Sequence, residues 1–369
     1  MKICIATFYA AHNYGAVLQA YALSCYLSKK HNASVSFLNY KPPSTKQAYK
    51  IFVPIRSIND IKHNVQSLIK YHSLKTRRFG FNAFIIKYFR ESIEYSSIAE
   101  IIQNPPEAEL FITGSDQVFR YKNEASDAYY LSFCQQIGKP SLAYAASFGT
   151  GNIDMKFKER VSNLLSGIGY LSSRESEGAA LIKQLIGKDV PVVLDPVFLL
   201  TMQEWKLLSS PPHIAEKYIL VYALVGYQEQ LAIAQQISLL TKFPIYMIHA
   251  TQVRDKAVSQ TFTHASPEEF VGLFSSAACV VTDSFHGTAF SLVFEKDFYC
   301  HIAIEAASSR IRNLLENLDL GARIVSNPKL IDLSNMKINY TLVSPIIRLR
   351  IKESTQFVSE ALACLDKDE

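Results

Sequence analysis

The chain has 369 residues, of which 49% are hydrophobic and 19% are charged, and its formal net charge is +5 at pH 7. A chain of this length exceeds one ordinary hydrophobic core, so two domains are expected. No run of about 18 apolar residues occurs, which argues against a transmembrane helix, and the N-terminus lacks the features of a secretory signal, which favours the cytoplasm.

The six cysteines are scattered and form no C-x-x-C pair. They are Cys4, Cys25, Cys134, Cys279, Cys300 and Cys364. Most lie among apolar residues, which predicts buried free thiols and neither a zinc site nor a disulfide framework. No His, Asp and Glu cluster with ligand spacing is visible elsewhere, so no metal is expected.

The first part of the chain alternates strands with helices. A strand over Lys2 to Thr7 leads through a short polar loop, 10–15, into a helix over Tyr14 to Lys30. The N-terminus of that helix suits an anion, although a plain crossover loop explains it equally. The loop is not a G-x-G-x-x-G fingerprint, so no dinucleotide is implied. A second strand follows over Ser34 to Asn39.

A strongly basic stretch comes next. Between Lys41 and Arg90 there are eleven Lys and Arg residues and a single acid, Asp60. Helices are predicted near 57–71, 74–91 and 97–103, with aromatic and aliphatic residues interleaved. The stretch is either a solvated helical pair whose apolar faces join the core, or a segment that lies on an anionic membrane surface or faces an anionic substrate.

More strands and helices complete the first predicted domain. Strands are expected over 110–113, 141–147, 168–172 and 190–194, with helices over 155–167 and up to about Ile186. Arg174 stands where a strand turns into a helix. An arginine at such a corner can form two parallel hydrogen bonds to a carboxylate or phosphate. The alternative is a structural ion pair with Glu175 or Glu177.

A second α/β series begins after a boundary near 197–215. Ser266, Pro267 and Glu269 form a capping box that starts one of its helices. The expected strands are 218–224, 244–249, 278–282 and 297–302, and the expected helices are 227–241, 308–318 and 345–365. The sequence therefore predicts domains over 1–200, with a basic insertion at 41–104, and over 215–340, followed by a C-terminal helix over 341–369.

The stretch 280–291 is the strongest candidate for an active site. Apolar strand residues lead into Thr282 to Gly287, and an apolar run of helical length follows. In an open parallel sheet, such a corner lies at the carboxyl ends of the strands, where ligands bind. The free N–H groups of the following helix favour an anion there. His286 is therefore either a functional imidazole or a residue that merely caps a loop.

Five corner motifs occur in order: NYGAVLQAY (13–21), GSDQVF (114–119), SRES (173–176), LDP (194–196) and TDSFHG (282–287). Together they resemble the polysaccharide pyruvyl transferase family, from residue 1 to about 325. The resemblance implies an α/β fold of two Rossmann-like domains in a GT-B-like arrangement. It also implies phosphoenolpyruvate as donor, a sugar hydroxyl pair as acceptor and a pyruvate ketal on a cell-surface or capsular glycan as product, with no further cofactor and no nucleic acid.

The resemblance places the donor-binding arginine at Arg174 and the catalytic histidine at His286. Other family members carry a second arginine two residues before the histidine, where this chain has Ser284. Arg310, Arg312 or Lys296 could supply the missing charge.

Further roles are hypotheses. Asp283 or Asp116 would serve as acceptor base or orient His286, although Asp283 could equally be the N-cap of the following helix. The candidate donor-binding residues are Arg174, Ser284, His286, Gly287, Thr288 and Arg310. The candidate acceptor-binding residues are Asn13, Tyr14, Gly15, Gln19, Ser115 and Gln117, of which Gln19 could equally be a packing residue.

Two other functions fit the same corners. One is a GT-B glycosyltransferase that uses a nucleotide sugar, and the other is a non-catalytic glycan-binding protein. The basic stretch 62–90 suits a lipid-linked acceptor and peripheral contact with the inner face of the plasma membrane. The oligomeric state is left open.

Overall fold

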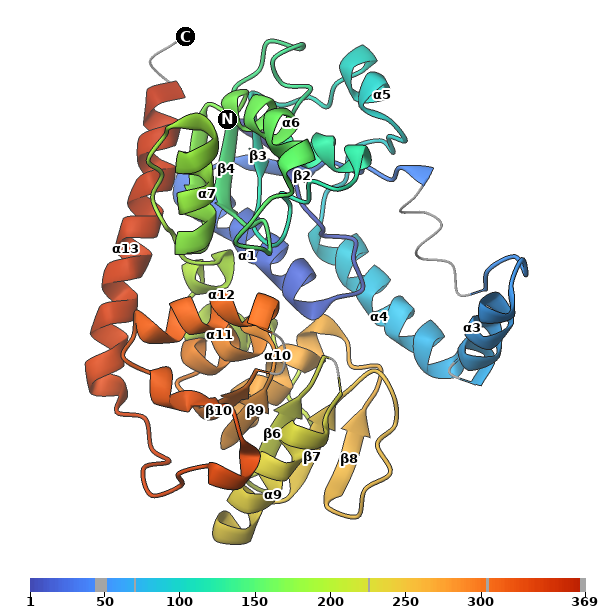
Figure 1. Cartoon of the computed structure of the whole chain (residues 1–369), viewed down its shortest axis with the longest axis vertical. Helices are drawn as coiled ribbons and strands as arrows, with labels where there is room; N and C mark the ends of the chain where they lie inside the picture. The colour runs from blue at the N-terminus through green and yellow to red at the C-terminus, as the bar shows by residue number, and fades with distance from the viewer. Residues whose placement is uncertain (44–51, 70, 225, 303–304, 366–369) are drawn as a thin grey trace. The chain divides into compact units, whose positions relative to one another are not determined.

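The computed structural model describes residues 1–43, 52–69, 71–224, 226–302 and 305–365 (Figure 1). The chain divides into two compact units, each with its own parallel sheet. The first comprises Met1–Asn64, Ile85–Leu199 and Arg348–Glu369, and the second comprises Val65–Phe84 and Leu200–Ile347. Part of the basic stretch thus belongs to the second unit, and the end of the C-terminal helix belongs to the first.

The sheet of the first unit has the strand order β2-β1-β3-β4-β5. Its strands are β1 (Lys2–Ala6), β2 (Ser34–Phe37), β3 (Leu110–Thr113), β4 (Ser141–Ala146) and β5 (Tyr170–Ser173). Every residue of β3 and β4 is buried. Continuous burial is typical of parallel strands covered on both faces, and it explains why these strands read as apolar runs in the sequence.

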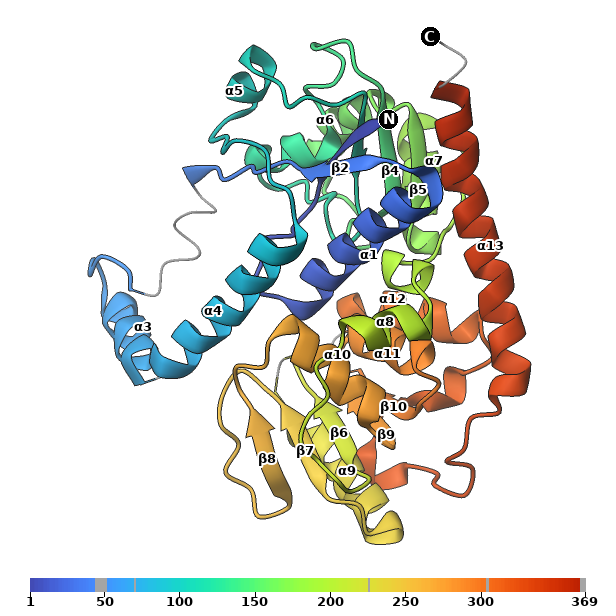
Figure 2. The same cartoon turned by 180° about the vertical axis from the view of Figure 1, so that it is seen from behind.

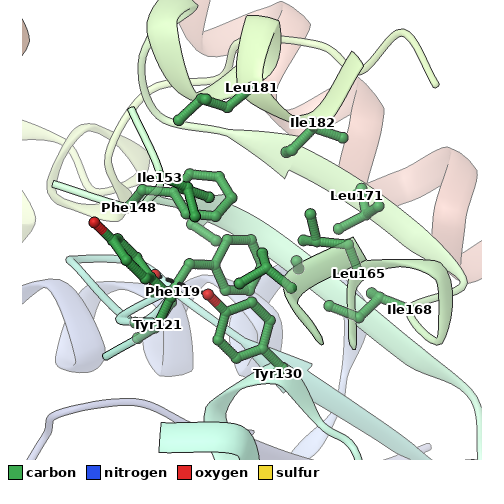
Figure 3. Close-up of a cluster of buried hydrophobic side chains, with 14 residues drawn as sticks. Phe119, Tyr121, Tyr130, Phe148, Ile153, Leu165, Ile168, Leu171, Leu181 and Ile182 are labelled. Atoms are coloured by element: carbon green, nitrogen blue, oxygen red, sulfur yellow. Dashed lines mark hydrogen bonds between the residues drawn. The ribbon is translucent and has the colours of Figure 1, made fainter. Parts of the chain in front are cut away.

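Helices cover both faces of this sheet. Figure 1 shows α6 (Met155–Ser166) and α7 (Ser176–Ile186) over one face, and Figure 2 shows α1 (Tyr14–His31) over the other. The cluster in Figure 3 fills the space beneath α6 and α7 and includes Leu165 and Ile182. Within this cluster, Phe119 and Tyr130 stack with ring centroids 4.6 Å apart, and the Tyr130 hydroxyl donates to the Phe119 carbonyl.

The second unit has a six-stranded parallel sheet with the order β11-β10-β9-β6-β7-β8. Its strands are β6 (Ile219–Tyr222), β7 (Ile245–Ile248), β8 (Val258–Phe262), β9 (Cys279–Thr282), β10 (Asp297–His301) and β11 (Ile324–Val325). Alternation along β6 separates the two faces of this sheet. Ile219 and Val221 pack with α9 (Gln228–Thr241). Tyr222 packs with Phe270 and Phe274 of α10 (Pro267–Ser276).

Several predicted elements need correction. The predicted strand 190–194 forms only an isolated bridge between Ser173 and Val192, because Pro191 has no N–H to donate and only its carbonyl accepts, from Ser173. Strand β8 and the short helix α8 (Met202–Leu208) were not predicted, although Thr201 and Glu204 form a complete capping box at the start of α8. The predicted capping box of Ser266 and Glu269 is confirmed.

The basic stretch contains α3 (Ile58–Ile69) and α4 (Tyr71–Tyr88), followed by α5 (Ile98–Gln103). On α4, Phe81 and Phe84 are fully buried, as a helix that joins the core requires. On α3, the side chains of Ile58, Ile61, Val65 and Leu68 are exposed, so the core-packing interpretation does not describe this face of the helix. Residues 44–51 and 70 of this stretch lie outside the described residues. None of the helices in the described ranges is both long and apolar enough to cross a bilayer.

The described cysteines are free thiols, as predicted. Four are buried (Cys4, Cys134, Cys279 and Cys300), Cys25 is half-buried and Cys364 is exposed. Burial raises the pKa of the Cys4, Cys279 and Cys300 thiols to about 12. Since unfolded thiols titrate near about 8.5, the stability that these neutral thiols contribute is present below that pH and is lost as the pH rises towards 12.

We therefore expect a thiol reagent such as Ellman's reagent, used near neutral pH, to modify Cys364 rapidly and Cys25 more slowly. The four buried thiols should react only in denaturant, because the thiolate is the reactive form and burial disfavours it. Cys364→Ser should remove the rapid phase. A rapid phase that survives this substitution would contradict the prediction.

Candidate functional site

In each unit, one point of the sheet is marked by a reversal of strand order. In the first sheet the chain moves from β1 outward to β2 and then returns to place β3 on the other side of β1. Loops that leave two such neighbouring strands diverge to opposite faces, and they leave a crevice outside the carboxyl ends. In the first unit this reversal point lies beyond Ala6 and Thr113, before the 10–15 loop and the GSDQVF motif.

Gln19 fixes the two strand ends at this point. Its side chain is fully buried, and its Nε2 donates to the Thr7 hydroxyl (3.0 Å) and to the Ala16 carbonyl (2.9 Å). Its Oε1 accepts from the Ser115 N–H (2.9 Å). Both amide donors and the carbonyl are engaged within the protein, so these contacts favour the packing interpretation of Gln19 over acceptor binding.

The other predicted acceptor residues lie near Gln19 in the chain or near its partner Ser115. Asn13 is exposed and is the N-cap of α1, with its side chain accepting from the Ala16 N–H, while Tyr14 and Gly15 are buried in the first turn. Gln117 is partly buried, and Gly114 has a φ of 117°. A Cβ at Gly114 would lie 2.0 Å from the Tyr144 carbonyl oxygen, so only glycine fits there.

Arg174 lies at the end of β5 and is surrounded by carboxylates. Its Nη1 is 2.9 Å from Asp195 Oδ2, its Nε is 3.6 Å from Glu175 Oε2 and its Nη2 is 3.6 Å from Asp116 Oδ1. Ser115, fully buried, donates its hydroxyl to Asp195 at 3.0 Å. The side chains of Arg174 and Asp195 are 1% and 0% exposed.

The electrostatics of this cluster oppose a free anion. Burial by itself would lower the pKa of Arg174, but the neighbouring Asp195, Glu175 and Asp116 outweigh it and raise the pKa. Three carboxylates around one guanidinium leave the cluster negative when all are ionised, so a dianion would have to compete with them. The structure therefore contains a structural ion pair of Arg174. Its shortest contact is with Asp195, and not with Glu175 or Glu177, which were the predicted partners. The donor contact of Arg174 stays a prediction.

The second unit reverses its strand order between β6 and β9. The Thr282 hydroxyl donates to the Tyr222 carbonyl (2.8 Å), and Asp283 Oδ1 accepts from the Leu224 N–H (2.9 Å). These two bonds tie the carboxyl ends of the strands together. The TDSFHG motif therefore stands at the point where open α/β sheets bind ligands.

Helix α11 (Phe285–Val293) starts at this point. Ser284 is its N-cap and accepts from the Gly287 N–H, so the alternative that Asp283 caps the helix is wrong. His286 lies in the first helical turn and is buried, not in a loop. A Cβ at Gly287 would meet Thr282 Oγ1 at 2.4 Å, which explains the glycine by close helix–strand packing. Thr288 is fully buried and donates its hydroxyl to the Ser284 carbonyl.

The three cations proposed to replace the missing arginine differ in placement. Lys296 precedes β10 and donates to the Ser275 carbonyl at the end of α10, at the amino edge of the sheet. Because His286 stands at the carboxyl edge, Lys296 is excluded as its neighbour. Arg312 is exposed and lies 3.9 Å from Glu316. Arg310 is partly buried on α12 (Glu305–Glu316), the helix that follows the carboxyl end of β10.

His301, which is not among the predicted site residues, is a second histidine at the carboxyl edge. It ends β10, the strand paired with β9, and is 6% exposed. Its Nδ1 is 2.8 Å from the Val325 carbonyl, which can only accept, so Nδ1 carries a proton. The feature of the sequence that indicates His301 is its position as the last residue of an apolar strand. Within the described ranges, no group of three or more His, Cys, Asp or Glu side chains could hold a metal ion.

A known protein family matches most of this chain. The family model described as polysaccharide pyruvyl transferase matches residues 13–302. This chain belongs to the polysaccharide pyruvyl transferase family. The match spans the corners of both units, from the N-cap of α1 to the end of β10. A search of the curated proteins found no match.

Solved structures of low sequence identity share the fold. Alr3699/HepE of Anabaena, solved with UDP, is 8% identical with a TM-score of 0.55, and the match covers 98% of this chain and 99% of that one. UGT89C1 of Arabidopsis thaliana is 12% identical with a TM-score of 0.53 and 99% coverage of both chains. A UDP-N-acetylglucosamine 2-epimerase of Rickettsia bellii is 13% identical with a TM-score of 0.51, covering 100% of this chain and 97% of that one. The protein thus has the predicted α/β fold of two GT-B-like, Rossmann-type units.

The buried pair between Arg174 and Asp195 gives a stability prediction. Arg174→Ala should lower the free energy of unfolding by about 3–5 kcal/mol, because it leaves the Asp195 carboxylate buried without its cation. Lys183→Ala is the control, since Lys183 pairs with Asp189 at 2.8 Å while both side chains are exposed, and it should change stability by less than about 1 kcal/mol. Urea denaturation measures both. Equal small effects would show that the buried cluster is not a structural unit.

Proposed function

We propose that this protein transfers pyruvate from phosphoenolpyruvate to a pair of sugar hydroxyls and forms a pyruvate ketal during cell-surface or capsular polysaccharide biosynthesis. The observation that carries the proposal is the position of His286, in the first turn of α11 at the reversal between β6 and β9. The membership of this chain in the polysaccharide pyruvyl transferase family supports the reaction class.

The reaction needs an acid and a base near neutral pH. A proton is delivered to the methylene carbon of the donor, a sugar hydroxyl attacks C2 and loses its proton, and phosphate leaves from C2. The second hydroxyl then attacks C2, loses its proton and closes the ketal. We assign proton delivery or phosphate stabilisation to His286, since an imidazolium can donate a proton or hold an anionic phosphate. Asp283 would accept the hydroxyl proton or orient His286, and Asp116 is the alternative acceptor base. The bond from the Leu224 N–H fixes one oxygen of Asp283.

The donor carries a carboxylate and a phosphate, so its site requires positive charge. We propose that the N–H groups at the start of α11 hold one anionic group, with Ser284, Gly287 and Thr288 shaping the turn. Arg310 is the cation that we assign in place of the missing arginine. The predicted contact of Arg174 with the donor also belongs to this proposal, although three carboxylates compete for its guanidinium.

For the acceptor, we propose that the sugar binds at the reversal between β1 and β3. Asn13, exposed at the start of α1, is the best-placed hydrogen-bonding side chain there, with Tyr14, Gly15, Ser115 and Gln117 forming the surrounding backbone and walls. We also propose a lipid-linked acceptor at the cytoplasmic face of the plasma membrane, which the basic stretch suits.

His286→Ala should reduce ketal formation by about 10²–10⁴-fold, as expected when a general acid is removed. His264→Ala is the matched control, because His264 is exposed on the same unit, and it should keep the activity of the unmodified protein. Phosphate release from phosphoenolpyruvate with a panel of free and lipid-linked glycosides measures both. Turnover of His286→Ala near that of the unmodified protein would contradict the role assigned to His286.

A second measurement tests the donor. If calorimetry shows that the protein binds a nucleotide sugar and does not bind phosphoenolpyruvate, the result would favour a glycosyltransferase.

The choice of Arg310 has its own test. Arg310→Gln should raise the KM for phosphoenolpyruvate by about tenfold or more, because a charge-assisted contact to the donor is lost. Arg312→Gln removes the same charge two residues away on the same helix, from an exposed position, and should leave KM unchanged. Equal KM values in the two variants would contradict the assignment.

A further inference from the structure

Helix α3 carries an exposed apolar face. Ile58, Ile61, Val65 and Leu68 are spaced three or four residues apart, so they share one side of the helix. Their exposed fractions are 73%, 46%, 52% and 67%. Isolated exposed apolar residues are ordinary, but four on one helical face form a continuous apolar stripe.

Asp60, Asn64 and Ser67 lie away from the stripe on α3, and each of them is polar and partly or fully buried. Ser67 is 6% exposed. Asp60, two helical turns earlier on the same side, accepts hydrogen bonds from the Arg56 N–H and the Ser57 hydroxyl. An amphipathic helix that packs on a protein core has the reverse orientation, with its apolar stripe inward. The exposed apolar stripe of α3 therefore requires an apolar partner other than the described residues of this chain.

The charges around this stripe favour an anionic environment. Lys62 is at the margin of the stripe on α3, and Arg56 lies two residues before the start of the helix. Two more exposed apolar residues, Phe52 and Ile55, come just before it. Across 41–90 the sequence has eleven Lys and Arg residues against the single acid Asp60, whose carboxylate is held in its own turn. A bilayer surface with anionic lipids offers both apolar chains and negative charge.

We infer that α3 docks on the surface of an anionic phospholipid bilayer, lying in the plane of the interface. Ile58, Ile61, Val65 and Leu68 enter the boundary between headgroups and acyl chains, while Arg56 and Lys62 extend to the lipid phosphates. The inferred purpose, access to a lipid-linked acceptor, rests on the proposed function, whereas the docking itself rests on α3. A 12-residue helix with this pattern lies on a bilayer and does not span it.

The test is flotation of the full-length protein with vesicles of phosphatidylcholine, with and without phosphatidylglycerol. The unmodified protein should float with the anionic vesicles only, and added salt should weaken the binding. Ile61→Gln combined with Val65→Gln should weaken it by about tenfold or more, because apolar surface no longer enters the bilayer. Asn59→Gln, exposed on the other side of α3, is the matched control and should bind as the unmodified protein does. None of these substitutions changes charge, so the comparison isolates the apolar contribution.

Three results would overturn the inference: equal flotation of the double variant and the unmodified protein, failure of the unmodified protein to float with anionic vesicles, or a dimer in solution that the double variant dissociates, which would assign the stripe to a second copy. Activity separates this inference from the proposed function. The double variant should keep its turnover with a soluble glycoside and lose it with a vesicle-bound acceptor. If the unmodified protein floats yet transfers no pyruvate to either acceptor, the docking stands and the proposed reaction fails.

Discussion

The reversal of strand order between β6 and β9 is the constraint on which the candidate active site depends. The chain builds β7 and β8 on one side of β6 and then returns to place β9 on the other. The two loops that leave this point must diverge, and the bond from the Leu224 N–H to Asp283 holds them in register. His286 gains its position from this topology, because α11 can begin only where β9 ends.

The first unit also has a reversal of strand order, but a different contact holds its strand ends together. There the strands on either side of the reversal are β1 and β3, and one buried amide, Gln19, binds the ends of both. Arg174 then links the Ser115 and Asp116 turn to Asp195, through contacts that are almost wholly buried. Charge burial of this kind is costly unless it is compensated, so the cluster fixes one arrangement of the corner. A role for Arg174 in binding must be consistent with that structural task.

The basic stretch combines two different helices. On α4, Phe81 and Phe84 are buried, and the Arg77 guanidinium lies 5.6 Å from the centre of the Phe81 ring. On α3, Ile58, Ile61, Val65 and Leu68 are exposed and Ser67 is buried. One compositional pattern, basic residues interleaved with apolar ones, therefore yields a core helix in one case and a surface helix in the other. The direction in which each helix turns its apolar stripe decides its role, and composition does not encode that direction.

The sequence by itself determined the two α/β series, the capping box at Ser266, the basic stretch and the corner at 282–287, because strand and helix periodicity and cap chemistry are local. The tertiary structure alone decided the strand orders, the pairing of Arg174 with Asp195, the N-cap at Ser284 instead of Asp283, and the separation of Lys296 from His286. Each of these depends on which strands become neighbours and at which edge a residue emerges. Contacts between residues far apart in the chain fix both, and no local pattern records them.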